Sequence, residues 1–349
     1  MSTLVIAGTP RKAKIRLGPL VEKIAGYLVL IAGIAWVLIN LFADVQRFES
    51  AAVTGLKNGA MYALIALGYT MVYGIIELIN FAHGDLFMLA TIVAANVMVH
   101  VLGVTDLGVA TLLPLLITLV VAMAFGALVN MGSELFAYRK LRNAPKLAPL
   151  MTAVGISFVF RGIAQQDYIN GSTQKNWPQI VWGGPKLGDT YVWQLVLVFG
   201  VTAPLLLLMT YIVAKTKQGK AMRAVAQDQD GARLMGINVN GTISFTFAMG
   251  GALAGAAGVL YFMVQTQTYY DTGTQLGLIA FTAAVLGGIG NLTGAVVGAL
   301  LIGLIQGINE GCEYGLGQAW SQSVVFIILI ILMVFRPAGI FGSNTTEKV

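Results

Sequence analysis

The side chains best suited to chemistry lie in one polar segment, residues 77–85 (ELINFAHGD), inside a long apolar region. The segment carries one of the two histidines of the chain and two carboxylates. His83 has no second histidine or cysteine at the spacing of metal ligands, so we predict that no metal binds. Ionisable groups inside an apolar region are rare, and where they occur they usually serve function. The segment is therefore the first candidate for a functional site.

The composition indicates the class of protein. Of 349 residues, 57% are hydrophobic and 10% are charged, whereas soluble domains have about 25% charged residues. Several windows of about 20 residues carry almost no charge, which is the length of a membrane-spanning helix. The net charge of +6 fits the excess of Lys and Arg in cytoplasmic loops and indicates no nucleic-acid partner. We predict an all-α polytopic protein of the lipid bilayer, and the single cysteine, Cys312, excludes an intrachain disulfide.

Catalytic and nucleotide-binding patterns are absent from the sequence. It has no G-x-S-x-G, no H-E-x-x-H and no convergent set of acids and bases. The closest trace of a phosphate-binding loop, Gly219-Lys220, lacks the upstream glycine and the Ser or Thr that should follow. The segment GGIGNLTG at 287–294 departs from dinucleotide spacing. We expect no catalytic residues and no cofactor bound by this chain, and a membrane-bound enzyme is the least supported alternative.

Apolar runs mark ten candidate membrane spans. They cover residues 24–43, 53–76, 85–103, 109–133, 147–165, 191–213, 242–264, 277–290, 294–310 and 320–335. The run 277–290 is short for a full span, and a half-helix is tolerated in a membrane only where protein or water satisfies its backbone. Glycines recur at four- or five-residue spacing in 294–311, which lets helix backbones approach closely. We predict about ten helices, some of them broken or halved, with close helix packing as the role of these glycines and a path-lining role as the alternative.

Basic residues fix the expected orientation of the spans. Four clusters fall in segments that one topology places on the same side, which the positive-inside rule assigns to the cytoplasm. The clusters are Arg11–Lys23, Arg139–Lys146, Lys215–Arg233 and Arg336 with Lys348. We therefore expect a cytoplasmic tail at 1–23, a transmembrane domain at 24–341 and a second cytoplasmic tail at 342–349. The run 24–43 is longer than the apolar core of a signal peptide and no A-x-A site follows, so we expect no cleavage.

Two loops between the spans carry most of the polar sequence. The loop 166–190 is expected outside, with Trp177 and Trp182 at the headgroup level. Arg161, just before it, is expected to reach the interface or to pair with Asp167. The loop 214–241 is expected in the cytoplasm and reads as one helix over 218–234, laid against the membrane. Its polar face would contain Lys220, Arg223, Gln227, Asp230 and Arg233, which can pair across a subunit boundary. The alternative is a solvated helix that contacts anionic lipid.

The polar segment 77–85 admits two interpretations. Asn80 or Asp85 can cap a helix, and Gly84 permits a break. Broken helices near the middle of a membrane are how many transporters build a path for their substrate. The alternative is a short cytoplasmic turn whose polar groups contact water.

Three ordered motifs carry a resemblance to a known family. They are NGAMYALIALGYTMVYGIIELINFAHGDLFMLA (58–90), GKAMRAVAQDQDGARLMGIN (219–238) and AFTAAVLGGIGNLTGAVVGALLIGLI (280–305). The chain resembles a membrane permease subunit of the branched-chain (hydrophobic) amino-acid importers driven by an ATP-binding cassette, over roughly residues 52–341. This resemblance implies a permease fold of about ten helices in the plasma (inner) membrane of a prokaryote, with both termini in the cytoplasm.

The resemblance also implies partners and site residues. The partners would be a second homologous permease, two ATPase subunits and an extracytoplasmic substrate-binding protein. The loop 219–238 resembles the helix that couples such permeases to the ATPase, although the usual leading Glu is Gln227 or absent. The implied coupling residues are Arg223, Ala224, Gln227, Asp228, Gly236 and Ile237. The implied residues of the translocation path are Asn80, Phe81, His83, Gly84, Asp85, Thr282, Gly288, Gly290 and Asn291.

The substrate is left open by the sequence. Branched-chain or related amino acids are the first expectation, and urea or short amides carried by the same architecture are the alternative. A stand-alone secondary transporter would need inward-facing carboxylates at mid-membrane. The spans 53–76, 109–133 and 242–264 contain no Asp or Glu away from their ends, which counts against it.

Overall fold

The computed structural model describes residues 18–104, 111–142, 144–145, 147–177, 184–188, 190–336 and 338–342. Several residues named above lie outside the described ones. They are the basic residues up to Arg16, together with Lys146, Trp182 and Lys348. The expected C-terminal tail lies outside them from residue 343 onward.

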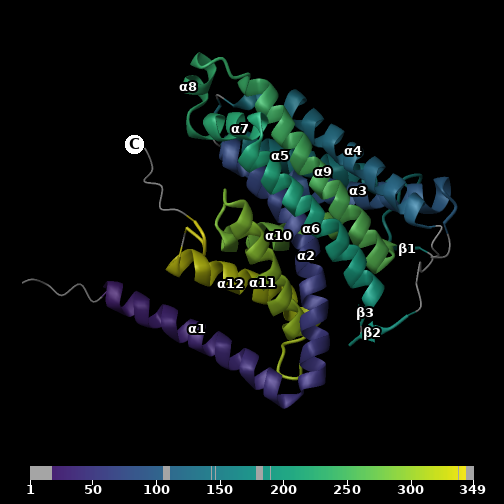
Figure 1. The fold of residues 1–349 in the computed structure, drawn as a ribbon, viewed down its shortest axis with the longest axis vertical. Helices are drawn as coiled ribbons and strands as arrows, with labels where there is room; N and C mark the ends of the chain where they lie inside the picture. Colours follow the sequence, from purple (N-terminus) through teal and green to yellow (C-terminus); the bar gives the residue numbers. More distant parts are fainter. Residues whose placement is uncertain are drawn as a thin grey trace, which may run out of the picture.

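The described chain is almost entirely helical (Figure 1). In order, its helices are α1 (Gly18–Ala43), α2 (Val45–Ile76), α3 (Ala82–Asn96), the π-helix η1 (Val97–Val101), α4 (Leu112–Phe136), the 3-10 helix η3 (Tyr138–Leu141), α5 (Leu147–Ala164), α6 (Val192–Lys215), α7 (Lys217–Gln227), α8 (Gln229–Leu234), α9 (Val239–Gln265), α10 (Thr272–Gly287), α11 (Leu292–Gly311), η4 (Gln318–Trp320) and α12 (Ser321–Phe335). Four two-residue strands form two antiparallel pairs: β1 (Lys175–Asn176) with β4 (Gln267–Thr268), and β2 (Lys186–Leu187) with β3 (Thr190–Tyr191).

Nine helices within the described residues are long and apolar enough to cross a membrane. The tenth expected span, 277–290, corresponds to α10, whose 16 residues are fewer than the 18 or more of each of the nine continuous helical spans. The predicted all-α polytopic class is confirmed. The expected spans match the helices closely, although α2 begins at Val45 instead of residue 53 and α1 begins at Gly18 instead of residue 24.

Helices α2 and α9 form the centre of the bundle and are mostly buried. Helix α11 packs along α2 and α4 packs along α9, while α3 packs mainly against α9 and α10 packs against α2, α3 and α11. Helices α1, α4, α6 and α12 instead leave large apolar side chains exposed on the outside. An exposed apolar surface of this kind is stable only against lipid or another subunit, because water would not solvate it favourably.

Small residues allow these helix pairs to touch through their backbones. A Cβ atom at Gly303 of α11 would overlap the backbone of Gly55 and Gly59 in α2. A Cβ atom at Gly251 of α9 would overlap the backbone of Gly126 in α4. The glycine spacing therefore does what the sequence predicted, since it permits the close approach of neighbouring helices.

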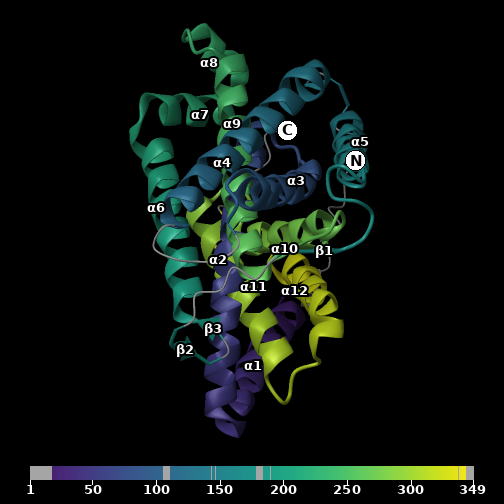
Figure 2. The ribbon, with the colours of Figure 1, turned by 90° about the vertical axis from the view of Figure 1, so that its right-hand side faces the viewer.

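The two ends of the bundle differ in character. Helices α7 and α8 project from one end, while β2 and β3 lie toward the opposite end (Figures 1 and 2). We refer to these as the α8 end and the strand end. Trp177, beside β1, is buried instead of lying at the headgroup level as expected. Its indole Nε1 donates a hydrogen bond to Thr268 Oγ1 at 3.0 Å, and its ring contacts Phe262 and His100, so its polar atom is satisfied inside the protein.

The glycine contacts generate a stability prediction with a control in the same helix. We expect Gly126→Ala to destabilise the protein by about 1–3 kcal/mol, because the added methyl group must displace the backbone at Gly251. Gly132→Ala, also in α4, meets nothing within 4 Å and should be neutral or stabilising by up to about 1 kcal/mol. Thermal unfolding of both purified variants checks this, and equal melting temperatures would contradict it.

Candidate functional site

The polar segment 77–85 is a break between two helices; Glu77 is exposed, whereas the polar residues from Asn80 onward are buried. Helix α2 ends at Ile76, Glu77 takes a left-handed conformation with φ of 53°, and α3 begins at Ala82. The side chains of Asn80, His83 and Asp85 are almost completely inaccessible. The alternative of a short turn whose polar groups contact water is therefore wrong.

Asn80 connects the break to two other helices. Tyr138 donates a hydrogen bond from its hydroxyl to Asn80 Oδ1 at 2.8 Å, and Asn80 Nδ2 donates to Asn130 Oδ1 at 3.4 Å. Asn130 Nδ2 in turn donates to the carbonyl of Phe247 at 2.7 Å. This chain of bonds joins the break to η3, α4 and α9. It satisfies polar groups that would otherwise be costly to bury.

The first turn of α3 lies deep in the bundle. The ring of His83 lies against Gly68 of α2, and Gly68 in turn contacts Gly250 of α9. Gly250 is eleven residues after Val239, the first residue of α9, or about 16 Å at 1.5 Å per residue. Helix α3 therefore begins beside the interior of its neighbours and not at their ends, which is the geometry of a broken membrane helix.

Aromatic rings surround the break on the side of α10. Tyr69 meets His83 edge-on at 4.9 Å between ring centroids, and Phe281 lies 6.0 Å from Tyr69 and 5.9 Å from Phe81. A small crevice with a cavity volume of about 10 Å³, room for about one water molecule, lies beside these rings. Its lining is mostly apolar and comes from α2, the break, α10 and the turn after α10. The lining residues are Tyr69, Tyr73, Ile79, Phe281, Ala284 and Ile289. Such a surface can contact an aliphatic side chain but offers little to a strongly polar solute.

Asp85 belongs to a charge cluster formed by three helix ends. Its carboxylate accepts a hydrogen bond from Ser157 of α5 and another, at 3.4 Å, from Thr274 of α10. Arg161 of α5 lies 3.8 Å from Asp85 Oδ2 and 3.6 Å from Asp271 Oδ1. The expected pairing with Asp167 is therefore wrong, because the guanidinium lies beside the carboxylates of α3 and of the residue before α10.

The remaining predicted path residues lie in α10 and the turn after it. Thr282 is buried and its hydroxyl donates to the carbonyl of Leu278 at 2.9 Å, within its own helix. Gly288 and Gly290 have φ of 104° and 93°, which favour glycine. Asn291 caps α11 by accepting from the Gly294 N–H at 3.0 Å.

The turn 288–291 is held by the C-terminal segment, since Asn291 Nδ2 donates to the carbonyl of Phe341 at 3.0 Å. The crevice connects this turn with the break at 77–81, because Ile289 and Ile79 both line it. Thus Phe81, Gly84 and Asp85 lie around α10, whereas Gly288 and Asn291 stabilise the turn.

The loop 214–241 forms two helices instead of the one predicted over 218–234. Helix α7 ends at Gln227, and Asp228 takes an extended conformation with φ of −159°. Asp228 then caps α8, because its carboxylate accepts a hydrogen bond from the Asp230 N–H at 3.0 Å. An Asp side chain at this position satisfies a backbone donor that has no partner in the helix, so a new helix begins at Gln229.

Gly236 ends α8 with a Schellman motif. Its φ is 79°, its N–H donates to the carbonyl of Arg233, and the N–H of Ile237 donates to the carbonyl of Ala232 at 3.0 Å. Ile237 packs back onto the apolar core and starts the approach to α9.

The exposed surface of α7 and α8 differs from the predicted polar face. Arg223 folds back and donates a hydrogen bond to the carbonyl of Val213, Ala224 is half-buried, and Gln227 is exposed. The most exposed large apolar side chains of the segment are Leu234, 89% exposed, and Met235, 82% exposed. They stand at the tip of α8, where the segment projects from the bundle (Figure 2).

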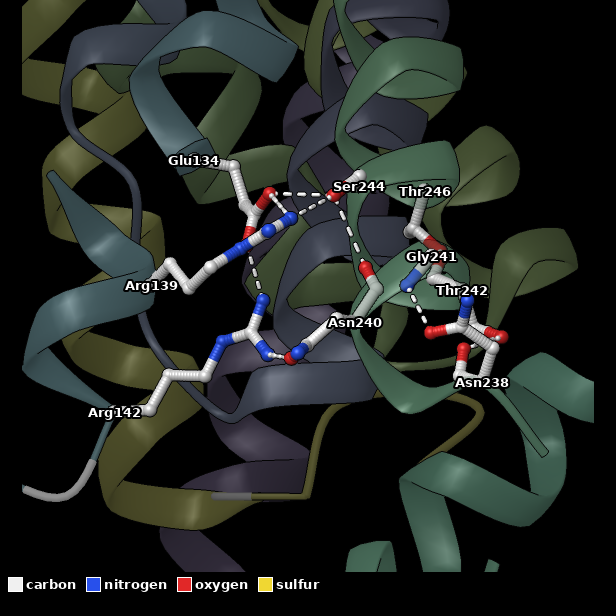
Figure 3. A network of polar contacts seen from close by, with 9 residues as sticks. All are labelled: Glu134, Arg139, Arg142, Asn238, Asn240, Gly241, Thr242, Ser244 and Thr246. Atoms are coloured by element: carbon white, nitrogen blue, oxygen red, sulfur yellow. Dashed lines mark hydrogen bonds and ion pairs between the residues drawn. The ribbon is translucent and has the colours of Figure 1, made fainter. Parts of the chain in front are cut away.

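A buried ionic network fixes the base of this projection (Figure 3). Glu134 of α4 is 0% exposed and accepts hydrogen bonds from Arg139 at 3.0 Å, from Arg142 and from Ser244 of α9 at 2.6 Å. Arg142 also donates to Asn240 at 2.7 Å. Burial lowers the pKa of Arg142 from its ordinary value, and the charge of Glu134 opposes that shift. The network ties the end of α4 to the start of α9.

Sequence reasoning missed Glu134, the exposed pair Leu234 and Met235, and the true partners of Arg161. Glu134 follows the expected span 109–133 immediately, so a carboxylate at the end of an apolar run was the available signal. Among the described residues, no group of three or more His, Cys, Asp or Glu side chains is placed to hold a metal ion.

Comparison with known proteins decides the family. The family described as "Branched-chain amino acid transport system / permease component" matches residues 51–334, which is more than half of the chain. The chain belongs to this permease family. Its matched region runs from the first turns of α2 to the last turn of α12, so it contains the break, the charge cluster and the segment of α7 and α8.

Relatives agree with this assignment over nearly their whole length. The chain is 35% identical over 316 residues to the high-affinity branched-chain amino acid transport system permease protein BraD of Pseudomonas aeruginosa, covering 88% of this chain and 99% of that protein. It is 34% identical over 313 residues to the corresponding permease protein LivH of Escherichia coli K12, covering 86% of this chain and 98% of that protein. No solved structure matches the chain significantly.

Proposed function

We propose that this permease forms part of the translocation path of an importer driven by an ATP-binding cassette and carries branched-chain amino acids. The observation that supports it best is the family match over residues 51–334, together with relatives whose names specify branched-chain amino acid transport. The lining of the small crevice beside the α2–α3 break is mostly apolar, which favours contact with an aliphatic group over contact with urea or a short amide.

The missing phosphate-binding loop and the exposed apolar side chains indicate which partners the chain needs. The sequence contains no phosphate-binding loop, so ATP would be hydrolysed by separate ATPase subunits. Leu234 and Met235 at the tip of α8 give those subunits an apolar contact, with the charged residues Asp230 and Arg233 around it. The exposed apolar faces of the bundle provide surface for a second permease. An extracytoplasmic binding protein would deliver the substrate at the strand end.

We place the α8 end in the cytoplasm and the strand end outside, in the plasma (inner) membrane of a prokaryote, with both termini cytoplasmic. The basic clusters support this orientation. Arg139, Lys140 and Arg142 lie beside the start of α9, and Lys215–Arg233 forms the end of α6 and the segment of α7 and α8. Both clusters are therefore near the same end of the bundle, as the positive-inside rule requires.

Transport assays test the substrate. In liposomes that contain this chain with its second permease, its ATPases and its binding protein, we expect ATP-driven uptake of radiolabelled leucine and little uptake of urea. A preparation without ATP serves as the control. Uptake of urea without uptake of leucine would overturn the amino-acid assignment while leaving the permease role intact.

The tip of α8 gives a prediction about ATPase binding. We expect Leu234→Asp to weaken association with the ATPase subunits by about 2 kcal/mol or more, roughly thirtyfold in affinity, because a buried carboxylate would replace an apolar contact. Co-purification of the ATPase subunits with the permease measures the effect. Leu187→Asp, on an exposed leucine in β2 at the strand end, is the matched control and should bind normally. Equal ATPase recovery in the two variants would exclude α8 as the contact.

The single cysteine tests the orientation of the chain. Cys312 follows α11, so our topology places it outside, and a membrane-impermeant maleimide should label it in intact cells. Burial raises the pKa of this thiol above its ordinary value. The reactive thiolate is therefore scarce at neutral pH, and labelling should keep accelerating as the pH rises beyond about 8.5. Cys312→Ser is the control. Labelling only after permeabilisation would show that the orientation is reversed.

A further inference from the structure

The guanidinium of Arg161 is incompletely hydrogen-bonded. Its distances to Asp85, 3.8 Å, and to Asp271, 3.6 Å, exceed those of a hydrogen bond. Its Nη2 donates to Ser157 Oγ at 3.3 Å, while its buried Nε has no hydrogen-bond partner among the described residues. A guanidinium has five donors in a planar fork that matches a carboxylate. The Nε of Arg161 faces Asp85 and is buried, so a further carboxylate would pair with the Nη1 and Nη2 donors, whose present contacts are long.

The two carboxylates of the cluster are not equivalent. Asp85 is buried and accepts hydrogen bonds from Ser157 and Thr274, so it is already engaged. The side chain of Asp271 is 33% exposed and lies at the start of α10, within ion-pair distance of Arg161. The cluster as a whole has two negative charges and one positive charge. Of the two carboxylates, Asp271 is the one that an ammonium group can reach.

An aromatic ring covers one face of the cluster. The guanidinium carbon of Arg161 lies 4.5 Å from the centre of the Phe158 ring, and Phe158 is 62% exposed. The site therefore combines a cation, an anion and an exposed apolar surface within one turn of α5 and the first turn of α10. These three groups are complementary to the carboxylate, the ammonium and the side chain of a hydrophobic amino acid.

We propose that Arg161 and Asp271 bind the zwitterionic head of the transported amino acid. Arg161 binds the α-carboxylate, Asp271 binds the α-ammonium, and Asp85 is a positioning residue that holds Arg161. Binding of the amino acid replaces the 3.6 Å ion pair between Arg161 and Asp271 by two shorter ones, from Arg161 to the α-carboxylate and from Asp271 to the α-ammonium. The net charge of the cluster stays the same. This inference rests on the proposed function and deepens it, because urea and short amides have no charges for these groups to pair.

Uptake by charge variants tests the proposal. In liposomes with the complete transporter, we expect Arg161→Gln and Asp271→Asn to lower ATP-driven leucine uptake by about tenfold or more, since each removes one charged hydrogen bond. Arg161→Lys keeps the charge without the planar fork, so its leucine uptake should lie between that of the unaltered chain and that of Arg161→Gln. Asp167→Asn, a change of the same kind on the exposed turn after α5, is the matched control and should transport normally.

A binding readout separates recognition of substrate from a structural role. In a Cys312→Ser background, a cysteine introduced by Phe158→Cys reports access to the cluster. We expect leucine to slow its modification by a maleimide in the transporter without binding protein, and urea to have no effect. Adding Arg161→Gln should remove the protection while the melting temperature and ATPase recovery stay the same. If Arg161 formed only a structural ion pair, Arg161→Gln would change the melting temperature and the ATPase recovery. Leucine would then protect the introduced cysteine in no variant.

The outcomes distinguish this inference from the function on which it rests. If the unaltered chain transports leucine, and Arg161→Gln and Asp271→Asn transport it equally well, the inference is wrong and the proposed function stands. If leucine fails to protect the introduced cysteine, the inference is also wrong. If the unaltered chain carries no leucine with ATP and all partners present, the proposed function itself fails.

Discussion

The structure depends on one constraint, which is that a break in a buried helix must find partners for its polar groups. The break between α2 and α3 satisfies it through Asn80, which is bonded to Tyr138 and Asn130. These bonds position the first turn of α3 deep in the bundle, beside Gly68 and Gly250. An unbroken helix would have carried His83 and Asp85 beyond the end of the bundle. The aromatic crevice and the charge cluster both exist because this break is held.

The charges of the cluster occupy the helix ends that stabilise them. Asp85 lies in the first turn of α3 and Asp271 immediately precedes α10, where the helix dipole favours an anion. Arg161 lies in the last turn of α5, where the dipole favours a cation. Three charges in an apolar region are expensive, and their placement at these ends reduces the cost. The cluster is therefore compatible with a stable bundle even though its ion pairs are long.

Apolar runs predicted the spans well because a helix that crosses a membrane must be long and nearly free of charge. The break after α2 was also predictable, since its polar residues interrupt such a run. The division between α7 and α8 was missed, although Asp228 is of a residue type that favours helix N-caps over helix interiors. The partners of Arg161 come from α3 and α10, far along the chain, and local sequence pointed to Asp167 instead. Trp177 was misplaced for the same reason, since its partner Thr268 follows α9.

Helix α9 is attached to its neighbours at both ends and in the middle. At one end Ser244 and Asn240 bind the Glu134 network of α4, and at the other end β4 pairs with β1 in the loop after α5. Between these points Gly251 and Gly126 bring α9 and α4 into backbone contact. Helix α9 is therefore held against α4 along most of its length, while α2 is held against α11 by its own glycines. The two pairs meet where Gly68 of α2 contacts Gly250 of α9, beside the His83 ring, so the start of α3 is positioned by both pairs at once.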